Sequence, residues 1–346
     1  MKSETESNAT RRKTRNKTIK GYTQFSTRYD SDTSAIWCWM QPEPRPCLNA
    51  TLIDELVQLQ KQLTNTYKNQ HPDTIWPFRH LILASKLPNI YNLGGDLGLF
   101  KYLIENKEEE KLRDYAYKCI HLLHRNIDNL DLPITMLSLV QGQALGGGFE
   151  TALSCDVIIA ERSSQMGFPE ILFNLFPGMG AYNLLARRIG SSLAERIILS
   201  GKTYGAAELY DMGIIDVLAE DGEGVQAVET YLKSHNQSHN TIRSIKKIRQ
   251  IVHPVTRQNL FDIVDIWVEA AMQLSDKDLA KMERLLHLQK NQKNSKIIKE
   301  QHTEEIPRRG DWRKLTGVSF PLKTHLGEDV SHNRRKTDCR RQTTTS

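Results

Sequence analysis

A run of three glycines between two apolar segments constrains the fold of this chain more than any other feature. Ile134–Val140 is a continuous apolar stretch typical of a buried strand, the glycines occupy positions 146–148, and Phe149–Ser154 fits a short helix. A second buried strand is predicted at Val157–Glu161. A glycine turn has no Cβ atoms, so a ligand can approach its backbone closely. The alternation of short strands and helices predicts an α/β fold.

The same alternation continues on both sides of the glycines. Asn49 or Thr51 is placed to cap the helix that follows it, and Ser192 and Glu195 have the spacing of a capping box. Gly213 stands where a helix over Tyr204–Met212 would end. Further strands are predicted at Ala35–Met40, His80–Ser85 and Ile214–Leu218, and further helices at about 97–106, 108–126, 260–274 and 275–292.

The net charge of +6 is concentrated at the two ends of the chain. Residues 1–20 carry seven basic and two acidic side chains, and residues 306–346 carry ten and four, which leaves residues 21–305 at −5. Segments this polar are expected to be disordered, and we place such tails at 1–30 and 299–346. No pattern of a DNA- or RNA-binding module accompanies them, so the basicity predicts no nucleic-acid partner.

Composition excludes several other classes of protein. No apolar stretch approaches the ~18 residues of a membrane helix, and the first twenty residues have no apolar core of a secretory signal. The five cysteines form no CxxC pair, so neither a disulfide framework nor a zinc site is expected. We therefore predict a cytoplasmic protein that requires no metal and no organic cofactor.

Two carboxylates stand out by their surroundings. Glu150 would lie on the first turn of the helix after the glycines, where an acidic residue can also serve only the helix dipole. Glu170, in Met166-Gly-Phe-Pro-Glu170, is flanked by apolar residues. Burial would raise its pKa towards the range useful for proton transfer, whereas an exposed loop position would not. Their spacing of twenty residues does not decide between these interpretations.

A second glycine turn, Leu93-Gly94-Gly95-Asp96, also leads into a predicted helix. Taken alone, such a sequence is usually only a turn. Combined with the glycines at 146–148, it would supply the second of two backbone N–H donors aimed at one carbonyl oxygen. Such a pair is an oxyanion hole, in which the loss of one donor typically costs ~10²–10³ in rate.

Several segments, in this order, resemble a known family. Over roughly residues 80–220 the chain is similar to the crotonase (enoyl-CoA hydratase/isomerase) superfamily, through NLGGDL, LVQGQALGGGFETALSCDVIIAE, MGFPEILFNLFPGMGAYNLLARRIG and ILSGKTYGAAELYDMGIID. Over about 30–290 it most resembles the bacterial diffusible signal factor (DSF) synthases, through AIWCWMQPEPRPCLNATLIDEL, the GGD turn and FNLFPGMGAY.

The resemblance implies a spiral of ββα units over 31–253, helices over 254–298 that cover an acyl pocket, and assembly as a homotrimer. It also assigns seven residues. Gly95 and Gly147 would supply the N–H donors to a thioester oxygen, Glu150 and Glu170 would be the catalytic acid and base, and Met179, Trp267 and Leu285 would line the acyl pocket, although core packing is an alternative for these last three.

The function implied is dehydration of a 3-hydroxyacyl thioester to the cis-2-enoyl form, followed by hydrolysis that releases an unsaturated fatty acid used in quorum sensing. The thiol would be acyl carrier protein or CoA, and an acidic carrier would need a basic patch, for which Arg187, Arg188 and 246–249 are candidates. One alternative is an enoyl-CoA hydratase of fatty-acid oxidation. Another is a protein that acts mainly by binding a sensor histidine kinase.

Overall fold

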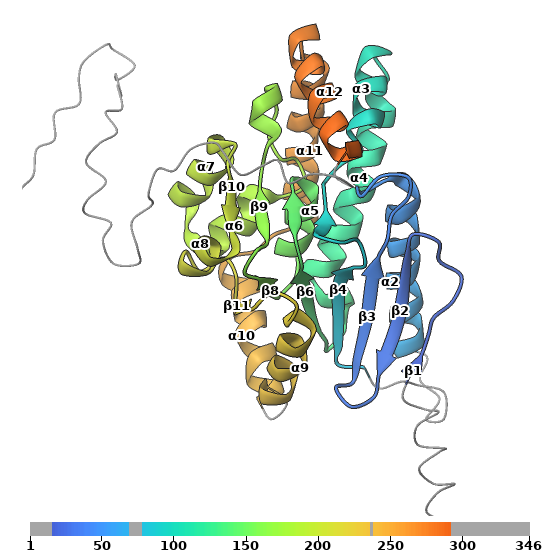
Figure 1. Ribbon diagram of the computed structural model, residues 1–346, viewed down its shortest axis with the longest axis vertical. Coiled ribbons are helices and arrows are strands. Elements are labelled where there is room, and N and C mark those ends of the chain that lie inside the picture. The colour runs from blue at the N-terminus through green and yellow to red at the C-terminus, as the bar shows by residue number, and fades with distance from the viewer. Residues whose placement is uncertain (1–15, 69–77, 236–237, 292–346) are drawn as a thin grey trace, which may run out of the picture. The chain divides into compact units, whose positions relative to one another are not determined.

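Four continuous apolar strands lie side by side at the centre of the protein (Figure 1). They are β3 (Ala35–Met40), β4 (His80–Ser85), β6 (Thr135–Val140) and β8 (Val157–Glu161), and each pairs with the next in parallel. Parallel strands are covered on both faces, which is why their sequences are apolar without alternation. The sequence predicted β3, β4 and β8 with their observed bounds and β6 to within one residue.

The computed structural model describes residues 16–68, 78–235 and 238–291. The predicted tail segments 1–15 and 299–346, and the last part of the predicted C-terminal helical region, 292–298, lie outside these ranges. None of the helices within the described ranges combines the length and apolarity needed to cross a bilayer.

The edges of the large sheet extend this parallel centre to seven strands, in the order β1-β2-β3-β4-β6-β8-β11. β1 (Asn16–Lys17) and β2 (Phe25–Asp30) pair antiparallel on one side, and β11 (Val217–Ala219) pairs parallel on the other. The prediction of a disordered tail as far as residue 30 is therefore wrong for β2. Its alternating side chains bury Phe25 and Tyr29 against the core, which offsets the cost of ordering the strand.

A second, smaller sheet has the order β10-β9-β7-β5. Its strands have three residues each: β5 (Ile90–Asn92), β7 (Gln143–Leu145), β9 (Gln165–Gly167) and β10 (Thr203–Gly205). The chain passes three times from the large sheet to this one and then into a helix, as β4–β5–α3, β6–β7–α5 and β8–β9–α6. The predicted α/β fold of ββα units is confirmed. These helices are α3 (Leu97–Glu105), α5 (Gly147–Leu153) and α6 (Ala181–Ile189).

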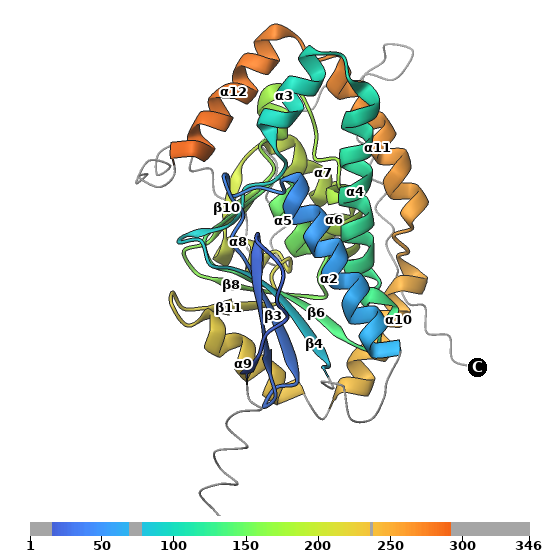
Figure 2. The same ribbon diagram turned by 90° about the vertical axis from the view of Figure 1, so that its right-hand side faces the viewer.

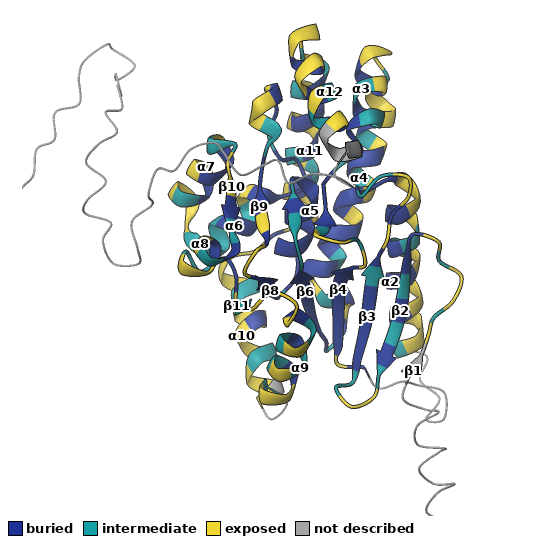
Figure 3. Cartoon of the chain, viewed as in Figure 1, coloured by how far each residue is buried: buried dark blue, intermediate teal, exposed yellow. Residues whose placement is uncertain are grey.

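Helices cover both faces of the large sheet (Figures 2 and 3). The main apolar core lies beneath α2 (Ala50–Lys68), α4 (Glu109–Ile127) and α5, and a smaller one lies beneath α9 (Gly224–His235). Between residues 238 and 291 the described chain forms three helices, α10 (His239–Val252), α11 (Arg257–Met272) and α12 (Asp276–Asn291). α11 packs on α4 and α12 packs on α3, so these two helices lie together at one end of the large sheet, whereas α10 lies at the other end.

Helix ends test the predicted capping residues. Asn49, not Thr51, caps α2, because its Oδ1 accepts a hydrogen bond of 2.8 Å from Leu52 N. The capping box predicted at Ser192 is wrong: Ser192 lies inside α7 (Ser191–Ser200), whose N-cap residue is Gly190, with a φ of +83° and no side-chain cap. Gly213, with a φ of +81°, ends α8 (Ala206–Asp211) as predicted, but the helix starts two residues later than predicted because Tyr204 belongs to β10.

Candidate active site

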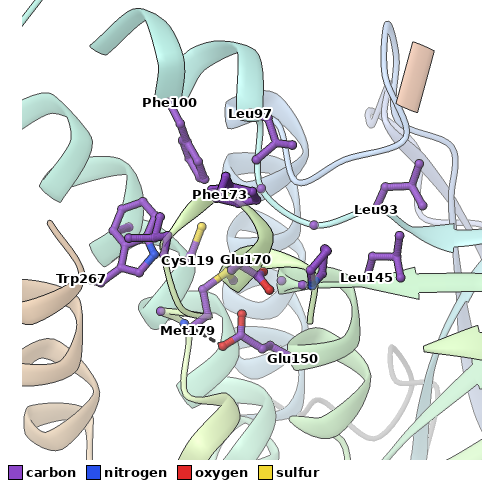
Figure 4. Close-up of a pocket in the computed structure, with 18 of the residues that line it drawn as sticks. Leu93, Leu97, Phe100, Cys119, Leu145, Glu150, Glu170, Phe173, Met179 and Trp267 are labelled. Carbon is purple, nitrogen blue, oxygen red and sulfur yellow. Dashed lines mark hydrogen bonds between the residues drawn. The ribbon is translucent and has the colours of Figure 1, made fainter. Parts of the chain in front are cut away.

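A cavity of about 110 Å³ opens between the two glycine turns and the C-terminal helices (Figure 4). Its walls come from segments far apart in the sequence, namely α3, α4, α5, α11, α12 and the loops after β5, β7 and β9. All seven site residues predicted from the sequence line this one cavity: Gly95, Gly147, Glu150, Glu170, Met179, Trp267 and Leu285.

Glu150 lies on the first turn of α5 and is only 1% exposed. Its Oε1 accepts hydrogen bonds from Met179 N at 2.7 Å and Ala181 N at 2.9 Å, which fixes the carboxylate between α5 and the start of α6. Burial raises the pKa of Glu150 to about 7, and the two N–H donors hold the pKa below the value that burial alone would produce.

Glu170 begins the short helical turn η2 (Glu170–Phe173) and faces the same cavity as Glu150 (Figure 4). Within the described residues its buried Oε2 has no hydrogen-bond partner. Burial, followed by the charge of Glu150, raises the pKa of Glu170 to about 8. The carboxyl group of Glu170 can lie here only because residue 146 is a glycine, since a Cβ on Gly146 would lie only 2.2 Å from Glu170 Oε1.

The two carboxyl groups can therefore exchange protons with a ligand near neutral pH. Each has a pKa raised mainly by burial, and the charge of Glu150 raises the pKa of Glu170 further. General acid–base catalysis is most effective when the pKa of the catalytic group lies near the working pH. The cavity is otherwise lined largely by apolar side chains, so few solvent molecules would compete for these protons.

The two glycine turns are in contact with each other where they line the cavity that holds Glu150 and Glu170. A Cβ on Gly94, which has a φ of +89°, would lie 2.8 Å from Leu145 O and 3.1 Å from Gly147 N. Gly147 is the first residue of α5. Within the described part of the chain, neither Gly95 N–H nor Gly147 N–H has a hydrogen-bond acceptor. Two free backbone donors thus lie close together at the cavity that holds the carboxylates.

Asp96 anchors the first glycine turn from its far side. Its carboxylate caps α3, accepting a hydrogen bond of 3.1 Å from Leu99 N, and forms an ion pair with Arg45. The GGD string is thus a turn joined directly to a capped helix, and its aspartate is used for structure rather than for contact with a ligand.

The apolar wall contains aromatic residues that the sequence did not single out. Phe100 packs edge-on against Trp267, with ring centroids 5.2 Å apart, and lies against Gly95, where a Cβ would come within 2.5 Å of its ring. Trp267 lies similarly against Gly178. Tyr115 and Cys119 reach the cavity from one face of α4, and their i, i+4 spacing is the signal that was available for them.

Cys119 does not provide a reactive thiol at neutral pH. It is fully buried, and burial raises the pKa of its thiol to about 12. The described residues contain no group of three or more His, Cys, Asp or Glu side chains that could hold a metal ion.

Two of the basic residues considered for carrier binding form ion pairs within the protein. Arg188 pairs with Asp216 and donates to the carbonyl of Ile214, and buried Lys246 pairs with Asp156 at 2.9 Å. Both views place α10 at the end of the large sheet away from α3 and α12, which flank the cavity (Figures 1 and 2). The structure therefore does not support α10 as the carrier-binding surface.

Comparison with known proteins first defines the fold. The solved structure of an enoyl-CoA hydratase from Bacillus halodurans superposes with a TM-score of 0.65 at 22% identity, over 76% of this chain and 100% of that one. The predicted crotonase-like spiral is thereby confirmed. The sequence model of the enoyl-CoA hydratase/isomerase family matches residues 39–295. The chain belongs to the enoyl-CoA hydratase/isomerase family.

Curated relatives match part of their own length. An enoyl-CoA isomerase/hydratase of Mycosarcoma maydis is 33% identical over 180 residues, 52% of this chain and 62% of that protein. The mitochondrial methylglutaconyl-CoA hydratase of Mus musculus is 34% identical over 149 residues, 42% of this chain and 45% of that protein. The matched regions thus span about half the length of these relatives.

Proposed function

We propose that this chain is an acyl-thioester lyase that dehydrates a 3-hydroxyacyl thioester to the cis-2-enoyl form and then hydrolyses the thioester. The observation that carries the proposal is the meeting of Glu150 and Glu170, both with a pKa near neutrality, beside two free N–H donors. The family membership supports the first step, and the resemblance to DSF synthases supports the second.

Dehydration uses the donors and the carboxyl pair together. Gly95 N–H and Gly147 N–H bind the thioester oxygen, so the negative charge that develops when the α-proton leaves is stabilised there. One glutamate, as carboxylate, takes the α-proton. The other, as carboxylic acid, protonates the β-hydroxyl, which leaves as water when the Cα–Cβ double bond forms. Because their titrations are coupled, both glutamates are assigned to the step as a pair.

Hydrolysis reuses the same groups. A water molecule loses its proton to a glutamate carboxylate and adds to the thioester carbon, and the oxygen of the tetrahedral intermediate remains on the two N–H donors. Collapse of the intermediate breaks the carbon–sulfur bond, and the thiol leaves with a proton from the acid form of the pair. The products are the unsaturated fatty acid, which would serve as a quorum-sensing signal, and the free thiol.

The decisive experiment is product analysis with matched 3-hydroxyacyl thioesters of CoA and of acyl carrier protein. Mass spectrometry should detect the cis-2-enoyl thioester and then the free acid, and the two thiols compared at equal concentration identify the preferred carrier. The variant Glu150→Ala/Glu170→Ala should produce neither product. Full activity of this double variant would refute the assignment of the catalytic pair.

An enoyl-CoA hydratase without thioesterase activity is the second candidate, because the curated relatives cited above carry hydratase names. It predicts reversible hydration of enoyl-CoA and no free acid in the same assay. A protein that acts mainly by binding a sensor histidine kinase would instead keep its effect on that kinase in the double variant, because the substitutions lie inside the cavity.

We also propose that the protein forms a closed homo-oligomer through α10. The face of α10 turned to the body is polar: Lys246 pairs with Asp156, and Gln250 donates to the carbonyl of Ile127. Its apolar stripe faces outwards instead, with exposures of 53–79% for Ile245, Ile248, Ile251 and Val252. An amphipathic helix with its apolar face outwards needs a partner to cover it.

Charge favours a second copy of this chain as that partner. Residues 230–261 contain six Lys or Arg and no acidic residue, a net charge of +6. Since residues 21–305 together have a net charge of −5, the remainder of this range has a net charge of −11. Two α10 surfaces facing each other would repel, whereas α10 against a different, acidic face of the next copy would attract. Such a head-to-tail contact builds a ring when its rotation closes, and a trimer is the smallest ring beyond a pair.

A further inference from the structure

The direction of the Gly95 N–H depends on contacts made by its neighbours. Gly95 N–H belongs to the Gly94–Gly95 peptide, whose carbonyl oxygen accepts a hydrogen bond of 2.7 Å from Leu48 N. A peptide unit is planar and nearly always trans, so its C=O and N–H point in opposite directions. By holding Gly94 O, Leu48 therefore turns Gly95 N–H towards the cavity that Gly95 lines.

One side chain connects the two backbone segments that make this contact. Tyr115 lies on α4, is 7% exposed and lines the cavity. Its hydroxyl donates a hydrogen bond to Leu48 O and accepts one of 3.4 Å from Asp96 N. Leu48 precedes α2 and Asp96 directly follows Gly95. The hydroxyl thus holds Leu48 in place and also fixes the peptide on the other side of Gly95.

The other donor has a different support. Gly147 N–H belongs to the first residue of α5, and the helix is extended from Gly146 O, which accepts from Glu150 N at 3.0 Å. Its orientation is therefore set by regular helix geometry. The Gly95 turn has no such helix around it, since α3 begins only at Leu97. Gly95 is held instead by an isolated backbone bridge to Leu48, and the Tyr115 hydroxyl is the side-chain group that binds at this bridge.

We propose that Tyr115 is a positioning residue for the thioester site: its hydroxyl orients Gly95 N–H by tying Leu48 O to Asp96 N. This inference rests on the proposed function, because the N–H needs an orientation only if it binds a thioester oxygen. The ring centroids of Phe100 and Tyr115 are 5.2 Å apart, so Tyr115→Phe would keep the packing and lose only the two hydrogen bonds.

The test compares Tyr115→Phe with Tyr91→Phe. Tyr91 is a fully buried tyrosine whose hydroxyl has no hydrogen-bond partner among the described residues, and it does not line the cavity. Tyr115→Phe should lower kcat about tenfold with little change in KM, less than the ~10²–10³ expected for losing a donor outright. Tyr91→Phe should leave both constants unchanged.

A spectroscopic measurement separates positioning from general loosening of the fold. The infrared stretch of a saturated acyl-CoA labelled with ¹³C at its thioester carbonyl should fall in frequency on binding to wild type and to Tyr91→Phe. In Tyr115→Phe it should return towards the frequency of the free thioester. A shift retained in full by Tyr115→Phe would overturn the inference alone. No shift in wild type would overturn it together with the proposed thioester site.

Discussion

Burial raises the pKa of both Glu150 and Glu170, but the two carboxyl groups have different hydrogen-bond partners. Glu150 keeps two backbone donors on one oxygen, whereas Glu170 has an oxygen with no partner among the described residues. Accordingly, the pKa rises further for Glu170, to about 8, than for Glu150, to about 7. At neutral pH the pair therefore holds both a proton acceptor and a proton donor, as the proposed dehydration requires.

The raised pKa values of Glu150 and Glu170 predict that the protein becomes less stable as the pH rises. Both groups have an ordinary pKa of 4.5, so between about pH 4.5 and 8 the folded protein binds more protons than the unfolded chain. The free energy of unfolding must then fall as the pH rises through this window. Replacing both carboxyls, in Glu150→Gln/Glu170→Gln, should remove a penalty of several kcal/mol at pH 8.5, because each pH unit by which a pKa is displaced corresponds to about 1.4 kcal/mol.

Urea unfolding of wild type and of this glutamine variant at pH 5 and pH 8.5 measures the effect. Glutamine keeps the shape and an acceptor oxygen, so the variant should gain stability over wild type mainly at pH 8.5. Glu223→Gln provides a control on the surface, far in sequence from the cavity. A stability difference that is the same at both pH values would show that burial does not raise the two pKa values.

Among the strands, the length of each strand determines whether the sequence alone predicts it. Strands of five or six buried residues, such as His80–Ser85, are predictable from the sequence because a strand covered on both faces is largely apolar without alternation. The three-residue strands of the small sheet have no readable period, and pairing with one another specifies them. β2 was missed because its alternation, FSTRYD, follows a strongly basic segment.

The site divides in the same way. Its glutamates and glycines lie in the glycine turns or on the first turn of the helical segments that follow a turn, where unusual residues are visible in the sequence because no regular pattern explains them. Phe100 and Tyr115 belong to amphipathic helices, in which an aromatic residue on the apolar face is indistinguishable from core packing. Only the packing of α3 and α4 against the glycine turns shows that these two residues reach the cavity.

The C-terminal helices should set the length of the acyl chain. Trp267, on α11, closes the cavity against Phe100 and Gly178, so Trp267→Leu should open space for further methylene groups. Each methylene newly buried contributes about 0.8 kcal/mol, and the preference for longer thioesters should rise about fourfold per carbon. Comparing kcat/KM over a series of acyl chain lengths measures this shift.

Trp39→Leu is the matched control for this prediction. Trp39 stacks on Trp37 in β3, with ring centroids 5.1 Å apart, and does not line the cavity. It should lose stability without any change in the preferred chain length. If Trp267→Leu also kept the wild-type preference while remaining folded, the C-terminal helices would not limit the acyl chain.

For the whole molecule, the distribution of charge matters more than its sum. The net +6 of the sequence comes from its ends, and the acidic body contains one basic, acid-free segment around α10. This segment also carries the outward apolar stripe, so hydrophobic and electrostatic contributions favour the same contact. An interface of this kind should weaken with added salt, because its charges lie partly in solvent.

Placing a charge on the stripe should dissociate the oligomer. Ile245→Asp/Ile248→Asp would bury two unpaired carboxylates in the proposed contact, which costs roughly 3 kcal/mol or more, or about a hundredfold in Kd. Ile266→Asp is the control, since Ile266 is 59% exposed on α11, outside the stripe. Sedimentation velocity should show a closed oligomer for wild type and Ile266→Asp and a monomer for the double variant. A double variant that stays folded and keeps the wild-type mass would exclude α10 as the interface.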